Sequence, residues 1–164
     1  MLDLARVTLG DAAALISANQ ASAGYHAPWV SPFVDRAGFE AWFGRILVGR
    51  NVSLIAREDK TGLIVGVVNI NELVAGVFQS GYLGYYGMVG FAGRGLMTEA
   101  VRLAVLYAFN ELGLHRLEAN IQPGNVRSIA LVQRLKFQRE GFSMRYLRID
   151  GAWRDHERWA VLAD

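Results

Sequence analysis

Three glycines, Gly90, Gly93 and Gly95, fall within six residues, after a strand-like run and before a helix-like run. A chain that leaves a strand through such a loop and enters a helix presents unpaired backbone N–H groups at the helix start, where the positive end of the helix dipole adds to them. Glycine permits positive φ and lets a pyrophosphate approach the backbone closely. The pattern therefore predicts a phosphate-binding loop, with an ordinary glycine-rich turn as the alternative.

Two well-known phosphate-binding loops do not fit this stretch. A P-loop requires Gly-Lys-Ser/Thr, and Arg94-Gly95-Leu96 stands in its place. A Rossmann fingerprint has a different glycine spacing and needs an acidic residue on a strand about 20 residues further on, where none stands out. A third kind of phosphate loop is required, and the rest of the chain indicates which.

Composition limits the classes of protein to consider. The chain has 164 residues, of which 52% are hydrophobic and 20% charged, so we expect one globular domain over residues 1–164. It has no cysteine, which leaves no disulfide, thiolate metal site or cysteine nucleophile. The three histidines do not cluster, so no metal site is expected. The net charge of +2 and the lack of a basic run argue against DNA binding.

Hydropathy argues against a membrane protein. The longest apolar stretches are too short to span a bilayer, and Asp3 and Arg6 interrupt any signal peptide at Met1. We therefore expect a cytoplasmic protein with no membrane partner.

Hydrophobic periodicity and turn residues divide the chain into strands and helices. Asp11 and Asp35 are placed to cap two early helices, and Asp150-Gly151 between two strand-like runs is a strong hairpin signal. We expect strands over residues 4–9, 52–57, 63–73, 82–89, 115–121, 142–149 and 153–162. Helices are expected over residues 12–16, 35–46, 98–112 and 126–135. This order predicts a mixed α/β (α+β) sheet flanked by helices and closed by a C-terminal β-hairpin.

These segments resemble, in order and spacing, the GNAT superfamily of N-acetyltransferases, and within it the RimJ/RimL-type ribosomal-protein-alanine N-acetyltransferases. Residues 93–100, Gly-Arg-Gly-Leu-Met-Thr-Glu-Ala, are similar to the family's Gly-Lys-Gly-hydrophobic-x-Thr-Glu-Ala loop. Pro28-Trp29 and residues 114–119, 123–128 and 141–155 resemble, respectively, its linker, its next strand, its Pro-x-Asn-x-x-Ser helix entry and its terminal hairpin. The chain departs from the family at Gly90, Lys136 and Val132, the last of which stands where many members have the tyrosine that protonates the thiolate.

The resemblance implies a GNAT-like fold with a central, mostly antiparallel twisted sheet, acetyl-CoA as co-substrate and no metal. Backbone N–H groups of the loop would hold the pyrophosphate, and the end of the preceding strand would pair with the pantetheine arm. The N–H of Met88 or Val89 would polarise the thioester carbonyl. The expected cofactor-binding residues are Met88, Val89, Gly93, Arg94, Gly95, Leu96, Met97, Asn125 and Ser128.

Acetyl transfer also needs a base for the acceptor amine and a donor for the departing thiolate. Glu72, at the end of an expected strand, is the candidate base, with an exposed carboxylate before a loop as the alternative. The resemblance makes Ser128 the candidate donor, with first-turn helix capping beside Asn125 as the alternative. Together with the Met88 N–H, these are the expected catalytic groups.

The acceptor must attack as a free amine. An α-amino group has a pKa of about 8 and a lysine about 10.4, so a protein N-terminal amine needs less help and is the favoured acceptor. A closed, acidic cleft would instead favour a small amine, and a non-catalytic acyl-CoA-binding module is the remaining alternative. The exposed terminal hairpin could support a homodimer.

Four residues are the expected contacts of this acceptor. They are His26, Trp29, Tyr85 and Asp155. A lone histidine is commonly structural, and a carboxylate on a strand commonly pairs with an arginine across the sheet. These are the alternative roles of His26 and Asp155.

Overall fold

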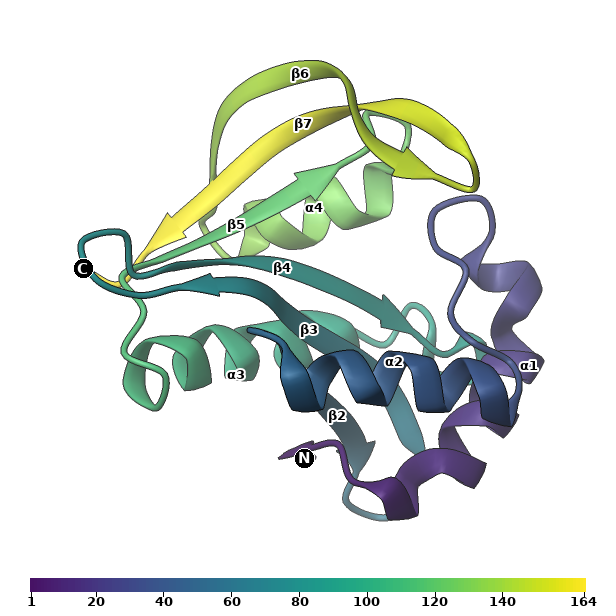
Figure 1. The fold of residues 1–164 in the computed structure, drawn as a ribbon. Coiled ribbons are helices and arrows are strands. Elements are labelled where there is room, and N and C mark those ends of the chain that lie inside the picture. Colours follow the sequence, from purple (N-terminus) through teal and green to yellow (C-terminus); the bar gives the residue numbers. More distant parts are fainter.

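Seven strands form one sheet in the order β1-β2-β3-β4-β5-β7-β6, in which only the β4–β5 pair is parallel (Figure 1). The computed structural model describes residues 1–164. The strands are β1 (Leu2–Arg6), β2 (Val52–Glu58), β3 (Ile64–Val74), β4 (Ser80–Gly87), β5 (Arg116–Ile121), β6 (Gln138–Ile149) and β7 (Ala152–Leu162). The helices are α1 (Ala12–His26), α2 (Arg36–Val48), α3 (Leu96–Asn110) and α4 (Val126–Arg134), with 3₁₀ helices η1 (Leu9–Asp11) and η2 (Val89–Phe91). The predicted mixed, mostly antiparallel sheet with flanking helices and a terminal hairpin is confirmed.

The largest difference from the expected elements is α1, which runs on to His26 instead of ending near residue 16. Its buried residues are spaced three and four apart, as on one face of a helix, but most of them are polar. They are Ala12, Leu15, Asn19, Ser22 and His26. A search for apolar periodicity misses such a face.

The two expected helix caps behave differently. Asp35 caps α2 as predicted, since its carboxylate accepts a hydrogen bond from the Gly38 N–H at 2.7 Å. Asp11 does not cap α1. It lies in η1, and its carboxylate turns back to accept the Thr8 N–H at 2.7 Å and to pair with Arg57 of β2 at 2.6 Å. Asp11 thus ties the start of α1 to the sheet.

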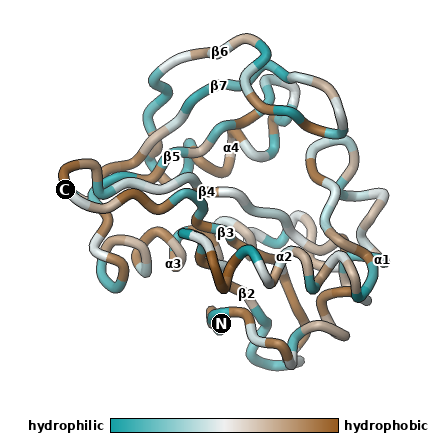
Figure 2. Tube along the Cα trace, in the orientation of Figure 1, coloured by the Kyte–Doolittle hydropathy of each residue, from teal (hydrophilic) through white to brown (hydrophobic).

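Helices cover both faces of the sheet. One buried cluster joins the sheet to α3 and α4, and a second joins it to α1 and α2. Leu54 belongs to the first cluster and its neighbour Ile55 to the second, as expected when successive side chains of a strand point to opposite faces. Figure 2 shows that apolar residues gather along β2 and β3, whereas β6 and β7 are more polar.

The parallel pair β4–β5 comes apart partway along its length. Its register runs from Ser80 opposite Arg116 to Leu83 opposite Ala119, and β4 then continues to Gly87 without a partner on that side. Figure 1 shows the two strands diverging there, with α4 following β5 across the opening. The last residues of β4 therefore present a free backbone edge.

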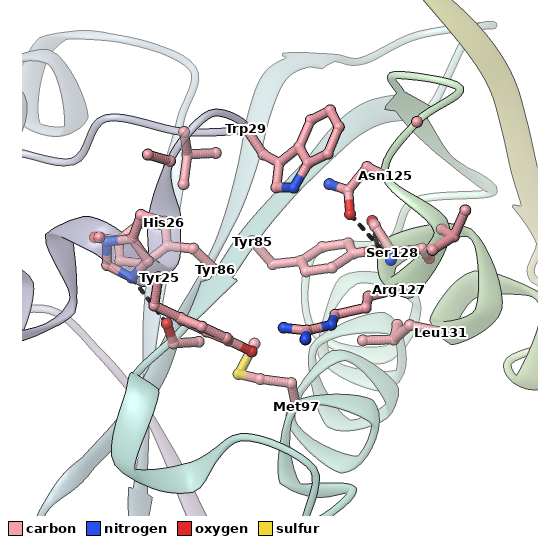
Figure 3. Close-up of a pocket in the computed structure, with 16 residues that line it drawn as sticks. Tyr25, His26, Trp29, Tyr85, Tyr86, Met97, Asn125, Arg127, Ser128 and Leu131 are labelled. Atoms are coloured by element: carbon pink, nitrogen blue, oxygen red, sulfur yellow. Dashed lines mark hydrogen bonds between the residues drawn. The ribbon is translucent and has the colours of Figure 1, made fainter.

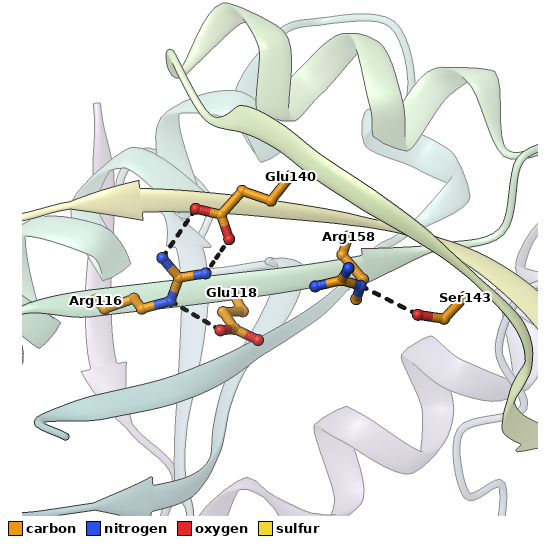
Figure 4. Close-up of polar contacts among 5 residues, drawn as sticks. All are labelled: Arg116, Glu118, Glu140, Ser143 and Arg158. Atoms are coloured by element: carbon orange, nitrogen blue, oxygen red, sulfur yellow. Dashed lines mark hydrogen bonds and ion pairs between the residues drawn. The ribbon is translucent and has the colours of Figure 1, made fainter.

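Ion pairs hold β6 onto the outside of the sheet. Arg116 of β5 bonds to Glu118 on its own strand at 2.8 Å and to both carboxylate oxygens of Glu140 on β6 (Figure 4). The guanidinium lowers the pKa of Glu140. On β7, Arg158 donates to the Ser143 hydroxyl at 3.1 Å. These contacts tie β6 to β5 and to β7.

Candidate functional site

The loop between η2 and α3 carries a run of free backbone donors. No hydrogen bond within the chain takes the N–H groups of residues 93–95, and the first helical bond of α3 is from the Glu99 N–H to the Gly95 carbonyl. The N–H groups of residues 96–98 are those that a helix start leaves unpaired. Gly93 and Gly95 have φ of +74° and +73°, and nothing lies within 4 Å of where a Cβ would be at either. The loop is open and fits a diphosphate.

Arg94, expected to add charge for the phosphate, already has a partner. Its guanidinium bonds to the Glu58 carboxylate at 2.6 Å and lies 5.2 Å from the centre of the Phe91 ring. The hydrogen bond from Arg94 lowers the pKa of Glu58. The positive charge beside the loop is therefore balanced by a carboxylate, and the free donors are the backbone N–H groups.

Neither expected oxyanion donor is free. The Met88 N–H donates to the Val65 carbonyl at 2.8 Å, and the Val89 N–H donates to the Ser22 hydroxyl at 3.1 Å. The backbone N–H of Met88 therefore points towards β3 and away from the opening between β4 and β5. The expectation that one of these two N–H groups polarises the thioester carbonyl is therefore corrected. The error arose because the sequence does not show, to within one residue, where the pairing of β4 with β3 ends.

Gly87 is the residue that faces the opening instead. Along an antiparallel strand, backbone groups alternate between the two sides, so Gly87 and Tyr85 point away from β3 when Met88 points towards it. The Gly87 carbonyl confirms this direction, because it accepts a hydrogen bond from His26 Nε2 at 2.8 Å. Since β5 has already diverged, the N–H groups of Tyr85 and Gly87 face the opening.

A cavity of about 520 Å³ fills the space between the end of α1, the end of β4 and the start of α4. Figure 3 shows side chains from these elements converging on it. They include His26, Trp29, Tyr85, Met97, Asn125 and Ser128. The structure thus brings together six of the expected contacts from distant parts of the chain: three expected to bind the acceptor and three expected to bind the cofactor.

Tyr85 and Ser128 link the two sides of the opening. The Asn125 carboxamide oxygen accepts the Ser128 N–H at 3.3 Å and so caps α4, as the alternative assignment anticipated. The Ser128 hydroxyl is not used in this cap: it lies 2.6 Å from the phenol oxygen of Tyr85. Burial raises the pKa of Tyr85 to about 12, so the phenol keeps its proton at neutral pH.

His26 is buried beneath the end of β4. A carbonyl can only accept, so the bond to Gly87 places the ring proton on Nε2 and leaves Nδ1 as a bare acceptor, which is buried without a partner. Burial also lowers the pKa of His26, which keeps the ring neutral. The His26 and Tyr86 rings lie in an edge-to-face arrangement, with their centres 5.0 Å apart. His26 therefore holds the Gly87 peptide in position.

Glu72 and Asp155 lie away from this cavity. Glu72 is exposed at a bulge of β3 near the strand's far end, where Val74 pairs with Ser80, whereas Gly66 at the near end pairs with Gly87. The Asp155 carboxylate accepts the Arg145 N–H at 2.8 Å within the β6–β7 hairpin. Neither residue lines this cavity or the second cavity described below. Their placement gives no support to the expected roles as base and acceptor contact.

A second cavity, of about 480 Å³, adjoins the first. It is bounded by the α1–α2 linker, by α2 and by the middle of β3 and β4. Val30, Tyr85 and Tyr86 line both cavities, so the two cavities meet at these side chains. Arg45 of α2 and Asn69 of β3 also line the second cavity. Sequence reasoning did not select Arg45, because one arginine among many carries no distinguishing pattern.

Two general features complete the description of the site. No helix combines the length and the apolar composition needed to cross a membrane. No three side chains of the types His, Cys, Asp or Glu come together as a metal-binding group would.

Comparison with known proteins gives a consistent picture. A family model described as an acetyltransferase (GNAT) domain matches residues 2–138. The probable N-acetyltransferase YjcK of Bacillus subtilis is 39% identical over 99 residues, 60% of this chain and 55% of that protein. The [ribosomal protein uS5]-alanine N-acetyltransferase of Escherichia coli is 45% identical over 93 residues, 57% of this chain and 48% of that protein. The matched part thus spans about half the length of these curated relatives.

Solved structures extend the likeness to almost the whole chain. Mycobacterium smegmatis RimJ in complex with CoA-disulfide has a TM-score of 0.87 and 29% identity, and the match covers 99% of this chain and 82% of that one. At lower coverage, a spermidine N(1)-acetyltransferase of Escherichia coli is 32% identical over 71 residues, 43% of this chain and 38% of that protein.

Proposed function

This chain belongs to the GNAT acetyltransferase family, and we propose that it transfers an acetyl group directly from acetyl-CoA to a primary amine, with a protein N-terminal α-amine as the favoured acceptor. One observation carries the proposal. A run of free backbone N–H groups at the start of α3 leads to the free edge of β4 and to a cavity between β4 and α4.

The chain's own groups account for binding the co-substrate. The N–H groups of residues 93–98 would hold the diphosphate. The free backbone groups of Tyr85 would pair with the amides of the pantetheine arm, as an added strand does. The Asn125 side-chain amide nitrogen remains a donor after its oxygen has capped α4, and it lies on the opposite wall of the cavity. The arm would therefore be gripped between β4 and α4.

Gly87 and Ser128 would serve the chemical step. The acceptor nitrogen attacks the thioester carbonyl carbon, a C–N bond forms, and the C–S bond breaks to release a thiolate. The Gly87 N–H would stabilise the negative charge on the carbonyl oxygen, an effect worth about 2.7–4 kcal/mol for one donor. The Ser128–Tyr85 pair would donate one hydrogen bond to the departing sulfur, since the other hydroxyl proton is used in the contact between the two residues.

The charges of the site favour an α-amine. Neither cavity is lined by a carboxylate that could deprotonate an ammonium group. At pH 7 about one in ten α-amines with a pKa near 8 is already free, compared with about one in 2,500 lysine amines with a pKa of 10.4. An α-amine can therefore react without a strong base, its proton passing to water.

The proposal is tested by incubating the protein with acetyl-CoA and measuring thiol release against three sets of amines. The first set contains peptides that begin with Ala or Ser. The second contains the same peptides with a blocked N-terminus and an internal lysine, and the third contains spermidine and other small amines. Release confined to the first set supports the proposal, and release with spermidine alone would replace the acceptor. Acetyl-CoA binding without release for any amine would indicate a non-catalytic module.

A further inference from the structure

The second cavity identifies a chemical feature of the acceptor. We propose that this cavity binds an amine whose molecule also carries a carboxylate, and that Arg45 and Asn69 recognise that carboxylate. The inference rests on the proposed acetyl transfer and narrows its acceptor class.

The position of the second cavity makes it the route by which an acceptor reaches the reaction centre. Tyr85 and Tyr86 line both cavities, and Tyr85 also contacts Ser128, the group proposed to face the sulfur. Gly87 follows Tyr86 directly in the chain and lines the first cavity, so an amine that passes these tyrosines from the second cavity reaches the Gly87 edge. The first cavity is left for the acetyl-bearing arm.

The polar groups of the second cavity are hydrogen-bond donors. No ion pair or hydrogen bond within the chain engages the Arg45 guanidinium. The Asn69 side-chain oxygen accepts the Ser53 hydroxyl at 2.5 Å, so the amide nitrogen is what remains for a ligand. The Arg45 guanidinium presents several N–H donors, and the Asn69 amide adds another in the same cavity. This set of donors suits a carboxylate.

No negative charge lines the second cavity to balance Arg45. Charged residues on neighbouring elements have partners of their own. On α2, Arg36 and Glu40 pair with each other at 2.9 Å, and Asp35 caps the helix. On the hairpin turn, Asp150 accepts the hydroxyl of Ser31, which lies on the rim, at 2.9 Å. The cavity lining thus carries one net positive charge.

This charge distribution argues against a polyamine acceptor. A polycation gains affinity from carboxylates, and it would here meet an unpaired guanidinium. The lining also includes the apolar side chains of Phe33 and Trp42, which suit the stem of a peptide. Two sources could supply the carboxylate: an acidic side chain at the second or third position of a peptide, or the α-carboxylate of a free amino acid.

The test compares acceptors that differ only in charge. Peptides beginning Ala-Glu, Ala-Gln and Ala-Lys, the same three with the variable residue in third position, and free alanine are assayed for kcat/KM. A hydrogen-bonded charge pair is worth about 1.5–3 kcal/mol, so the acidic peptide is expected to exceed its Gln counterpart by about 10- to 150-fold. Free alanine as the best acceptor would assign the carboxylate to an amino acid. Equal values for all charges would overturn the inference.

Variants of Arg45 test whether this residue causes the preference for acidic peptides. Arg45→Gln is expected to bring the ratio of acidic to neutral peptide down to about one, and Arg45→Glu to reverse the order in favour of Ala-Lys. Arg36→Gln, which removes an arginine from the same helix outside the cavity, should leave the ratio at the wild-type value. An acidic preference that survives in Arg45→Gln contradicts the assignment.

Measuring peptide binding tests the proposed carboxylate site even if no acceptor is acetylated. Isothermal titration of the same peptides into the protein saturated with CoA measures affinity alone. If no acceptor is acetylated, the proposed function fails, whereas tighter binding of acidic peptides that is lost in Arg45→Gln would still support the carboxylate site. Equal affinities in that titration would refute the site itself.

Discussion

The phenol oxygen of Tyr85 lies 2.6 Å from the hydroxyl oxygen of Ser128, and this contact joins the end of β4 to the first turn of α4. The two residues come from the opposite sides of the gap where β4 and β5 diverge. Many family members carry a tyrosine where this chain has Val132, which is buried in the core. Val132 on α4 lines neither cavity, whereas Tyr85 of β4 brings a phenol into the first cavity.

Removing either hydroxyl of this pair is expected to slow the reaction. Ser128→Ala and Tyr85→Phe should each lower kcat by about 10- to 150-fold, because a hydrogen bond to a charged group is worth about 1.5–3 kcal/mol. The double variant should lose much less than the product of the two, since each hydroxyl acts through the other. Steady-state kinetics with the four proteins measures this coupling. Fully multiplicative losses would mean that the two groups act independently.

Gly95 should be needed for binding CoA beyond its effect on stability. Gly95→Ala places a side chain at φ +73°, and Gly113→Ala does so at φ +66° at the other end of α3, with open space around both. Each change should cost about 1–2 kcal/mol of stability by chemical denaturation. Only Gly95→Ala should also weaken CoA binding, by about tenfold or more, because it turns the donors of the loop away from the diphosphate. Equal CoA affinities in the two variants would contradict the loop's role.

Neutralising Glu58 should strengthen CoA binding. Glu58→Gln removes the carboxylate that pairs with Arg94 at 2.6 Å and frees the guanidinium for a phosphate. We expect a few-fold lower dissociation constant at low salt, with the gain shrinking as salt is added. Glu40→Gln, which unpairs Arg36 on α2, should leave the affinity unchanged. A weaker complex in Glu58→Gln would show that the pair is needed to shape the loop.

His26 should act by positioning Gly87. Gln can supply an N–H where His26 supplies Nε2–H, whereas Leu cannot, and a buried carbonyl without its donor costs about 1–3 kcal/mol. His26→Leu should therefore lower stability and kcat, and His26→Gln should recover most of both. Equal kcat in the two variants would remove the positioning role.

The same residue gives stability a pH dependence. Burial lowers the pKa of His26 below that of the unfolded chain, near 6.5, so below that pH the unfolded state binds a proton that the folded state does not. Stability should therefore fall as pH drops from about 6.5 towards the folded-state pKa, by at most about 1.4 kcal/mol per pH unit. Denaturant titrations from pH 7.5 to 5 should give a shallower slope for His26→Gln. Identical slopes would mean that His26 binds protons equally well in both states.

The main elements of the fold could be predicted because most carry strong local signals. The Asp35 cap and the Asp150-Gly151 turn are local, and the apolar runs in β2 and β3 are continuous. The full length of α1 could not be predicted, since Asn19, Ser22 and His26 occupy its buried face and each is held there by contacts to distant segments.

In the candidate site, the conformation of the glycine loop could be predicted better than the residues of the chemical step. The glycine loop and the Asn125 cap depend on residues close together in the chain. The choice between Met88 and Gly87 as the donor depends on which side of β4 each residue faces, and a shift of one residue reverses it. Arg45 and Asn69 come together only through the tertiary fold.

The most direct measurement is mass spectrometry of one peptide that carries both a free N-terminal alanine and an internal lysine, after incubation with the protein and acetyl-CoA. The proposed function predicts one acetyl group, located by fragmentation on the α-amine, with an equal amount of free CoA released. An acetyl group on the lysine, or an unmodified peptide in the presence of bound acetyl-CoA, would contradict it.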